Sequence, residues 1–393
     1  MQEATWIAAY TCYIAAMSQG IYLHIPFCSS FCSYCDFYRE PYSPRAETAF
    51  VEAILTEIKL RHRELAAQET HSIYCGGGTP SLLQPDSWRE LFAALQAHCK
   101  LSPDCEITAE ANPDSVDGQK LKLLRASGLN RLSLGAQSFS NRALQVLGRR
   151  HDAAAVRRAV KLAREAGIDN LSLDLLIGLP ESAAVELRDE LQSLLDLEPQ
   201  HLSCYLLTLE GGVPLQLAVE QGGEQLPDEQ RIADDYLLLV ETMTAAGYQH
   251  YEISNFAQPG FACRHNLNYW QQGDYLGFGP AAVSTVGTLR RTNLPDLNGY
   301  SRALALRNLP PAESEKLEQS TRCAERIMLS LRRGDGLDLE ALQQDFGYDL
   351  LALEGRLIGD LKQSGDLTLE ESRLRLTVAG MLRYNLIVAA LLP

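Results

Sequence analysis

The sequence has no surplus of positive charge. Its 393 residues include 35 lysines and arginines against 50 aspartates and glutamates, which leaves a net charge of −15. A protein that holds nucleic acid through its phosphates needs basic side chains to displace the counterions of the backbone. We therefore expect no nucleic-acid partner.

The sequence also lacks a hydrophobic run that would cross a membrane at its start. The apolar stretch at residues 5–17 is shorter than the roughly 20 residues that a spanning helix needs. An acidic residue and no lysine or arginine precede it, so the basic start of a secretory signal is missing. We interpret residues 1–19 as an N-terminal extension, with Met1 or Met17 as the start of translation, and expect the fold to begin at Gly20.

A disulfide framework is missing as well. The ten cysteines show no framework spacing outside one short motif. Free thiols and iron–sulfur chemistry both belong to a reducing compartment. The cysteine pattern therefore predicts a cytoplasmic protein.

That motif lies in residues 22–38. Cys28, Cys32 and Cys35 form a C-x3-C-x2-C pattern directly after an apolar run that ends at Ile25. Such gaps let one loop bring each sulfur to a different iron of a cluster. Three protein ligands leave one iron of a 4Fe–4S cluster open to a small molecule. A zinc site is an alternative, although zinc normally takes four ligands in two separated pairs, and three incidental cysteines are another.

The motif resembles the signature of the radical S-adenosylmethionine (SAM) superfamily, C-x3-C-x-aromatic-C, with Tyr34 as the aromatic residue. The resemblance implies a 4Fe–4S cluster held by Cys28, Cys32 and Cys35. Its open iron would chelate the amino and carboxylate groups of SAM. Reduction by an electron donor would then cleave SAM to methionine and a 5′-deoxyadenosyl radical.

Short apolar runs alternate with amphipathic segments in the first half of the chain. Strands are predicted at 20–25, 71–75, 105–109, 130–134, 170–176 and 200–206, and helices between them at 47–64, 86–98, 117–126, 152–166 and 185–195. This alternation predicts an α/β fold with parallel strands and crossover helices. Six such units resemble the (β/α)6 partial TIM barrel of the superfamily. Chemistry in such barrels lies at the C-terminal ends of the strands, which is where the cysteine loop follows the first strand.

The alternation ends after the sixth strand. We therefore expect four regions: the extension at 1–19, the radical SAM partial barrel at 20–206, a middle region at 207–310 and a C-terminal tail at 311–393. Within the middle region we predict a loop at 209–224 and a helix at 227–246. In the tail a helix is predicted at 322–331, and residues 337–392 should then run helix, helix, hairpin, helix, an α+β order that resembles a winged helix. We interpret it as a packing module, because the chain is acidic overall.

A second candidate site is the sequence Cys-Gly-Gly-Gly-Thr-Pro-Ser at residues 75–81, directly after an apolar strand. Glycines let the backbone approach a ligand closely and adopt positive φ. A Gly-Gly-Gly-Thr-Pro turn is typical of the coproporphyrinogen-oxidase-like branch of the superfamily. The glycine-rich motif of that family contacts the methionine amino group of SAM.

Polar residues occupy or flank later strand ends. Asp174 lies in the apolar segment 171–177, where a carboxylate is costly unless it is paired or hydrogen-bonded. A structural ion pair with Arg149 would satisfy it. A ligand role is the favoured interpretation, because barrel mouths collect such residues. By resemblance to the branch, the SAM contacts are Tyr22, Gly77, Gly78, Thr79, Glu110, Gln137, Arg149 and Asp174.

The third candidate site is Arg-His-Asn-Leu-Asn-Tyr-Trp at residues 264–270. We expect an exposed His265 whose imidazole, beside flat aromatic side chains, suits haem iron. It lies well beyond the sixth strand, so we expect it to be separate from the SAM pocket. A hydrogen-bonded histidine in a polar loop is the alternative. The segment resembles the His-Asn-x-x-Tyr-Trp motif of the HemW-type haem chaperones, which implies that His265 binds haem. Cys263 is an alternative ligand, and His24 and His201 are weaker candidates.

The resemblance to this haem-chaperone family covers nearly the whole chain. A related enzyme family, the oxygen-independent coproporphyrinogen III oxidases, has a fourth cysteine two positions after the third, where this chain has Phe37. That family also has a longer N-terminal arm. Both departures make decarboxylation of porphyrinogen propionates the alternative function rather than the expected one, and whether the chain is an enzyme stays open.

We therefore expect a haem chaperone that binds haem and transfers it to recipient haem proteins such as respiratory enzymes. A 4Fe–4S cluster and SAM would be bound in the barrel. The implied partners are haem, its recipients and an electron donor for the cluster. Contact with a membrane surface is expected only through the recipients.

Overall fold

The first strand begins two residues before the predicted start of the fold. The structure, a computed structural model, describes residues 18–392. Strand β1 (Ser18–Ile25) is buried along most of its length. The apolar stretch at 5–17 and the choice between Met1 and Met17 lie outside the described residues.

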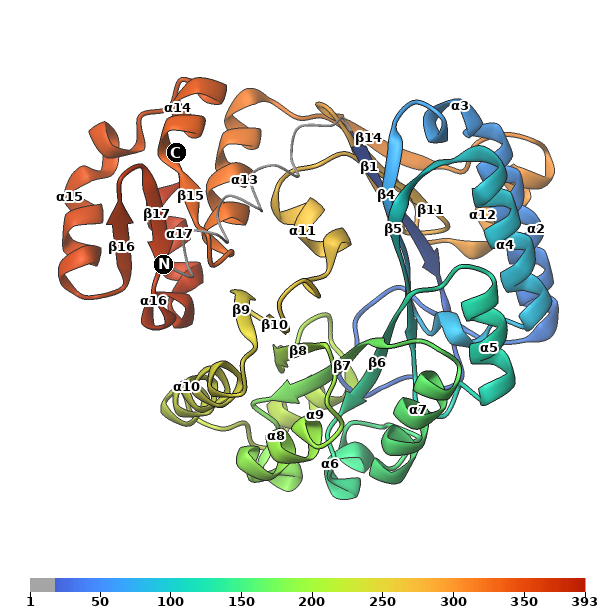
Figure 1. Ribbon diagram of the computed structural model, residues 1–393, viewed down its shortest axis with the longest axis horizontal. Coiled ribbons are helices and arrows are strands. Elements are labelled where there is room, and N and C mark those ends of the chain that lie inside the picture. Colours follow the sequence, from blue (N-terminus) through green and yellow to red (C-terminus); the bar gives the residue numbers. More distant parts are fainter. Residues whose placement is uncertain (1–17, 393) are drawn as a thin grey trace.

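The six predicted βα units are present, which confirms the expected fold class. The strands are β1, β4 (Glu69–Gly77), β5 (Lys100–Ala111), β6 (Arg131–Gln137), β7 (Asn170–Ile177) and β8 (His201–Leu206), and they pair in this order in parallel. The main crossover helices are α2 (Pro44–Leu60), α4 (Pro85–His98), α5 (Gly118–Ala126), α7 (Ala153–Glu165) and α8 (Leu187–Leu195). The strands form an open arc with the helices on its outer side (Figure 1).

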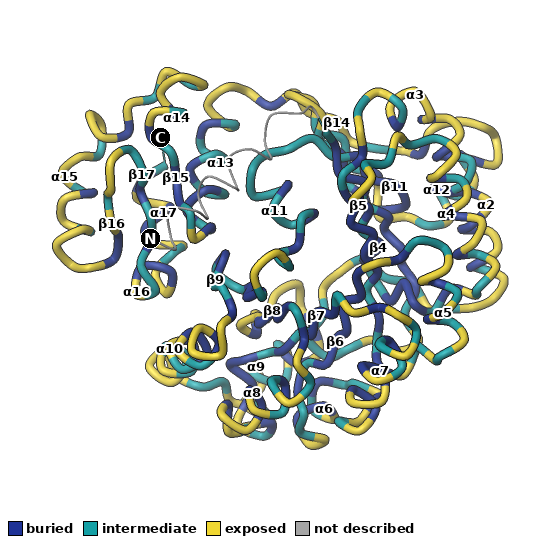
Figure 2. The backbone as a smooth tube through the Cα atoms, viewed as in Figure 1, coloured by how far each residue is buried: buried dark blue, intermediate teal, exposed yellow. Residues whose placement is uncertain are grey.

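Local sequence explains where the outer helices begin and which side they bury. Asp117 and Asp152 precede α5 and α7, and each side chain accepts a hydrogen bond from a backbone N–H of the first turn. Helix α7 turns Val156, Val160 and other apolar residues toward the strands. The strands are buried on both faces, and each outer helix is exposed only on the side that is turned away from the strands (Figure 2).

The middle region extends the barrel sheet at both edges. Strand β11 (Tyr275–Phe278) pairs in parallel with β1, and β12 (Val283–Val286) and β13 (Leu289–Asn293) follow outward. The outermost strand at this edge, β14 (Ala312–Lys316), comes from the start of the predicted tail at 311–393. At the other edge, β10 (Asn255–Ala257) pairs with β8, and β9 (Gln249–Glu252) pairs with β10. Within residues 18–392, the sheet therefore has twelve strands. The four-region division of the chain stays a prediction.

Four further helices belong to this middle region. The helix predicted at 227–246 is α10 (Glu229–Ala245). The loop predicted at 209–224 is partly wrong, because α9 (Pro214–Glu220) forms there. Proline at its first position suits a helix start, and Leu215 N–H donates to Ser33 O of the cysteine loop, 2.9 Å away. The others are α11 (Arg264–Trp270), which lies inside the arc, and α12 (Leu297–Ala305) (Figure 1).

The tail packs as a small separate layer beside the open side of the arc (Figure 1). It contains α13 (Gln319–Leu331), β15 (Leu337–Asp338), α14 (Leu339–Phe346), α15 (Leu350–Gln363), β16 (Leu367–Glu370), β17 (Arg373–Leu376), α16 (Val378–Leu382) and α17 (Tyr384–Leu391). The strands form a three-stranded sheet of order β15-β17-β16. The helix predicted at 322–331 is α13. Residues 337–392 follow the predicted order of two helices and a hairpin, and the helical end consists of two short helices rather than one. Among residues 18–392, no helix is long and apolar enough to cross a membrane.

Candidate cofactor site and adjoining cavity

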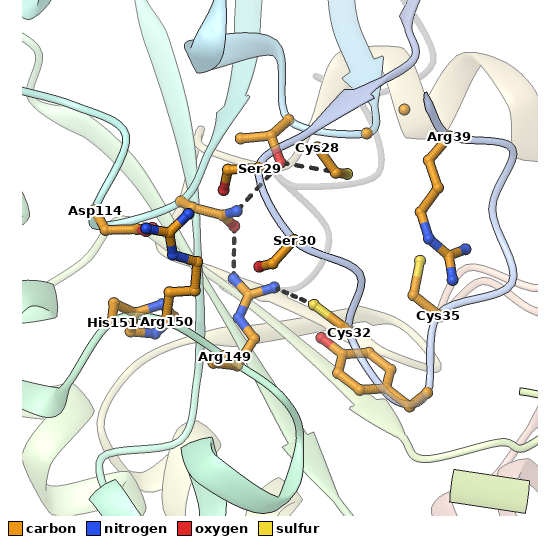
Figure 3. Close-up of a pocket in the computed structure, with 15 residues that line it drawn as sticks. Cys28, Ser29, Ser30, Cys32, Cys35, Arg39, Asp114, Arg149, Arg150 and His151 are labelled. Carbon is orange, nitrogen blue, oxygen red and sulfur yellow. Dashed lines mark hydrogen bonds between the residues drawn. The ribbon is translucent and has the colours of Figure 1, made fainter. Parts of the chain in front are cut away.

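The cysteine loop is closed by a short pair of strands. Strand β2 (Phe27–Cys28) pairs with β3 (Glu40–Pro41), so residues 29–39 form a loop with joined ends. Cys28, Cys32 and Cys35 are half-buried, carry no disulfide and line one cavity, here called the cluster pocket (Figure 3). Its space of about 520 Å³ is partly open to solvent. The structure therefore brings the three predicted ligands together.

The chemistry of this donor set fits a cluster. Within residues 18–392, no three His, Cys, Asp or Glu side chains converge closely enough to share a single metal ion. A 4Fe–4S cluster, however, takes each thiolate on a different iron, so its ligands stand apart from one another. Burial raises the pKa of the thiols of Cys28 and Cys35.

The glycine-rich turn lies directly beside this loop. The register of β1 and β4 places Ile25 opposite Gly77, and Gly78 N–H donates to Ile25 O at 2.8 Å. A Cβ on Gly78 would lie 2.6 Å from Phe27 O, and Gly77 has φ +111°. Glycine is therefore required at both positions, at Gly78 because the backbones approach closely and at Gly77 because its backbone is left-handed. Thr79 N–H then donates to Phe27 O, which fixes the turn against the loop.

Arg149 forms the opposite wall of the cluster pocket (Figure 3). Its guanidinium donates to Gly135 O at 2.9 Å, to Asn112 Oδ1 at 2.6 Å and to Cys32 Sγ at 3.4 Å. No salt bridge joins it to Asp174 in the described part of the chain. The ion pair considered as an alternative for these two residues is therefore not formed.

Sequence reasoning missed Asn112. Its side chain donates to Thr79 Oγ1 at 3.2 Å and accepts from Arg149, so it links the glycine-rich turn to the opposite wall. Thr79 Oγ1 lies 3.7 Å from Cys28 Sγ, which extends the link to the cysteine loop. Its position in the sequence could have revealed it, because Asn112 directly follows the end of β5, two residues after Glu110.

Two predicted carboxylates lie inside the barrel. Glu110 accepts from Tyr74 OH at 2.8 Å and from Gly77 N–H at 3.2 Å. Asp174 accepts from Ser133 Oγ at 3.1 Å. Desolvation raises the pKa of Glu110 to about 7 and also raises that of Asp174. Neither charge is fully compensated, which favours polar ligands that donate hydrogen bonds to them.

Gln137 ends β6 in a strained conformation. Its φ of +66° is in the left-handed region, which a residue with a side chain rarely adopts. Such outliers gather at binding sites, where the surrounding structure holds them. Gln137 and Asp174 line neither the cluster pocket nor the second cavity described below.

The expectation that His265 is exposed is wrong. Helix α11 carries it into the barrel, where it is 1% exposed and its ring stacks on Tyr74 with centroids 5.2 Å apart. One ring nitrogen bonds Ser72 Oγ at 2.9 Å and the other bonds Tyr269 OH at 2.8 Å. Burial lowers the pKa of His265 to about 3, so the imidazole is neutral.

The three other candidate haem ligands are also buried and bonded. Cys263 Sγ lies 3.5 Å from Glu106 Oε1, and burial raises the pKa of this thiol to about 12. His24 contacts Tyr22 OH and a backbone carbonyl through its two nitrogens. His201 contacts two hydroxyls in the same way. Each of these three side chains therefore already has a hydrogen-bond partner within the barrel.

A second cavity, here called the aromatic cavity, lies between the barrel, α11 and α13. It encloses about 1570 Å³, part of it open to solvent. Its aromatic lining consists of Tyr22, Phe37, Tyr38, Tyr269, Trp270 and Tyr275. Gly77 lines both this cavity and the cluster pocket, so the two meet at the glycine-rich turn. The expectation that the His265 segment is separate from the SAM region is therefore wrong.

Family comparisons agree with this architecture. The model of the radical SAM superfamily matches residues 22–193, and that of the HemN C-terminal domain matches residues 317–383. Coproporphyrinogen III oxidase (HemN) from Escherichia coli, a solved radical SAM enzyme, superposes with a TM-score of 0.81 at 24% identity. The superposition covers 98% of this chain and 93% of the HemN chain. This similarity shows the fold.

Curated relatives match over most of their length. The haem chaperone HemW of Bacillus subtilis is 32% identical over 375 residues, which is 95% of this chain and 99% of the relative. HemW of Mycobacterium tuberculosis H37Rv is 34% identical, with 95% and 94% coverage. HemW of Escherichia coli K12 is 39% identical over 270 residues, with 68% and 70% coverage.

Proposed function

Because this chain belongs to the HemW family of radical SAM proteins, we propose that it binds haem and transfers it to recipient haem proteins. In this proposal a 4Fe–4S cluster occupies the cluster pocket, and SAM extends from it past Gly77 to the barrel end of the aromatic cavity, which Tyr22 and Glu110 line. Haem occupies the rest of the aromatic cavity. The observation that carries the proposal is the meeting of the two cavities at Gly77. A radical SAM domain implies both the cluster and SAM.

Cys28, Cys32 and Cys35 are the proposed cluster ligands. A 4Fe–4S cluster with one open iron supplies a place to chelate SAM and, when a donor protein reduces it, a route to cleave SAM. The chain's own residues would bind and orient SAM, through the backbone of the glycine-rich turn, the Arg149 guanidinium and the hydrogen-bond acceptors Glu110 and Asp174. The full set of proposed SAM contacts is Tyr22, Gly77, Gly78, Thr79, Glu110, Gln137, Arg149 and Asp174.

The lining of the aromatic cavity supports haem as the second ligand. Flat aromatic side chains from β1, α11 and β11 line its walls, and such surfaces suit a porphyrin face. His265 is the proposed haem-binding residue, one layer behind Tyr269. Ligation through His265 requires that its bond to Tyr269 OH open. Cys263 is the alternative ligand, and it would first have to lose its proton.

The test is haem transfer measured by absorbance. Protein with a reconstituted cluster is loaded with haemin under anaerobic conditions and mixed with the haem-free form of a b-type haem protein. We expect the Soret band of the acceptor to appear faster than from free haemin. An equal rate would contradict a transfer function. In parallel, the protein is incubated with coproporphyrinogen III, SAM and a reductant. Formation of protoporphyrinogen would favour the oxidase alternative, in spite of Phe37 at the position of the fourth cysteine.

A further inference from the structure

The end of the aromatic cavity that faces the tail carries positive charge among apolar side chains, which are Leu317, Met328 and Leu329. Arg290 of β13 and Arg322 of α13 both line it, together with the carboxylate Glu325. The aromatic residues and Gly77 line the cavity from the barrel side. A ligand with a flat apolar body and anionic groups at one edge would match this distribution.

Arg290 is held mainly by one carboxylate, Glu325, and a second carboxylate, Glu315, lies 3.5 Å from its Nη1. Its guanidinium donates to both oxygens of Glu325, each at 2.9 Å, in a two-pronged arrangement. Side-chain exposures of 27% for Arg290 and 20% for Glu325 show that water still reaches the pair. The hydrogen bonds that Arg290 donates to Glu325 raise the pKa of Arg290. A pair of this kind contributes about 1 kcal/mol or less, so another carboxylate can replace Glu325 at small cost.

Arg322 has no such partner. Its guanidinium lies 5.8 Å from the ring centroid of Phe346, and it forms no salt bridge with any residue in the range 18–392. Its neighbour on the helix, Arg326, is paired with Asp345. The cavity thus contains one cation without a counter-charge and one whose counter-charge is exchangeable.

We propose that Arg290 and Arg322 bind the two carboxylates at one edge of the haem. Until the haem binds, Glu325 stays hydrogen-bonded to Arg290. This inference rests on the proposed function, because it concerns the same cavity. Binding replaces the Arg290–Glu325 bonds with equivalent bonds to a propionate, and the released Glu325 turns to solvent. No covalent bond forms or breaks. Because Arg290 belongs to the sheet and Arg322 to α13, the ligand would also link the barrel to the tail.

The proposal is tested by titrating haemin into cluster-loaded wild-type protein and the variants Arg290→Gln, Arg322→Gln and Glu325→Gln. Loss of a charge-assisted bond should weaken haemin binding about tenfold in each arginine variant. Removal of the competing carboxylate in Glu325→Gln should strengthen it about two- to fivefold. The matched control is Arg291→Gln, because Arg291 follows Arg290 on β13 but donates to Pro310 O and does not line the cavity. Thermal unfolding of every variant checks that it folds.

Haemin dimethyl ester, which has no free carboxylates, provides the second measurement. Wild-type protein should bind haemin more tightly than the ester, and the double variant Arg290→Gln/Arg322→Gln should bind both equally. If wild-type protein binds haemin but the arginine variants behave like Arg291→Gln, this inference is overturned and the proposed function stands. If wild-type protein binds neither compound, the proposed function itself fails.

Discussion

Asp174 offers a sharp test of the SAM site, because its charge is poorly compensated in the ligand-free protein. It accepts hydrogen bonds from Ser133 and, at 3.5 Å, from Ser172, yet burial still raises its pKa. A SAM molecule that donates hydroxyl groups to Asp174 would supply the missing compensation. Substitution by asparagine keeps the shape and removes the charge.

We expect Asp174→Asn to weaken SAM binding by about 2 kcal/mol, the usual contribution of a hydrogen bond to a charged group. That is roughly a thirtyfold rise in Kd. The stability of the protein without SAM should change by only about 1 kcal/mol or less, because the variant removes a desolvated charge that forms no salt bridge, although Arg131 and Arg149 attract it from a distance. The cluster absorbance should persist, since Asp174 does not line the cluster pocket.

Titration calorimetry of the cluster-loaded protein with SAM measures this effect, and urea unfolding measures stability. Asp366→Asn is the matched control, because Asp366 is an aspartate of the tail that is only 1% exposed. An Asp174→Asn variant with wild-type SAM affinity would refute a direct role. Equal losses of SAM affinity in both variants would show that the effect is general rather than local.

Three further outcomes are expected. Replacing Cys28, Cys32 and Cys35 by alanine should reduce iron from about four per chain to none after reconstitution, and iron retained in the triple variant would exclude these ligands. The folded pKa of Glu110, about 7, lies above its ordinary 4.5, so the native state binds more protons between these pH values. Wild-type stability relative to Glu110→Gln should therefore fall by up to about 3 kcal/mol as pH rises from 4.5 to above 7, and a difference in urea unfolding that does not vary with pH would count against this. His265→Ala should remove or blue-shift the Soret band of bound haemin while leaving iron content unchanged, and a wild-type spectrum in this variant would place the haem ligand elsewhere.

Local sequence patterns predicted the barrel well. Each strand and helix of the six βα units carries its own apolar pattern, so their existence follows from short windows of sequence. The three cysteines and the glycine-rich turn were predicted for the same reason, since each is a continuous segment. Their meeting also follows, because the ends of neighbouring parallel strands lie at one edge of the sheet.

Long-range pairing could not be predicted in this way. Nothing in residues 275–278 indicates that β11 pairs with β1, which lies some 250 residues earlier. The burial of His265 has the same origin, because it depends on α11 entering the arc and meeting Ser72 of β4. The roles of single polar residues such as Asn112 and Arg322 likewise could not be predicted, because their contacts form only when distant segments of the chain come together.

The central claim, that haem binds in the aromatic cavity, is tested most directly by titrating haemin while recording the Soret band and tryptophan fluorescence together. Trp270 lines the cavity, so bound haem should quench it. We predict a saturable Soret band with parallel quenching in wild-type protein, and a clearly smaller quench in Trp270→Phe at the same haem occupancy. A Soret band that does not saturate, or one accompanied by identical quenching in both proteins, would contradict the account.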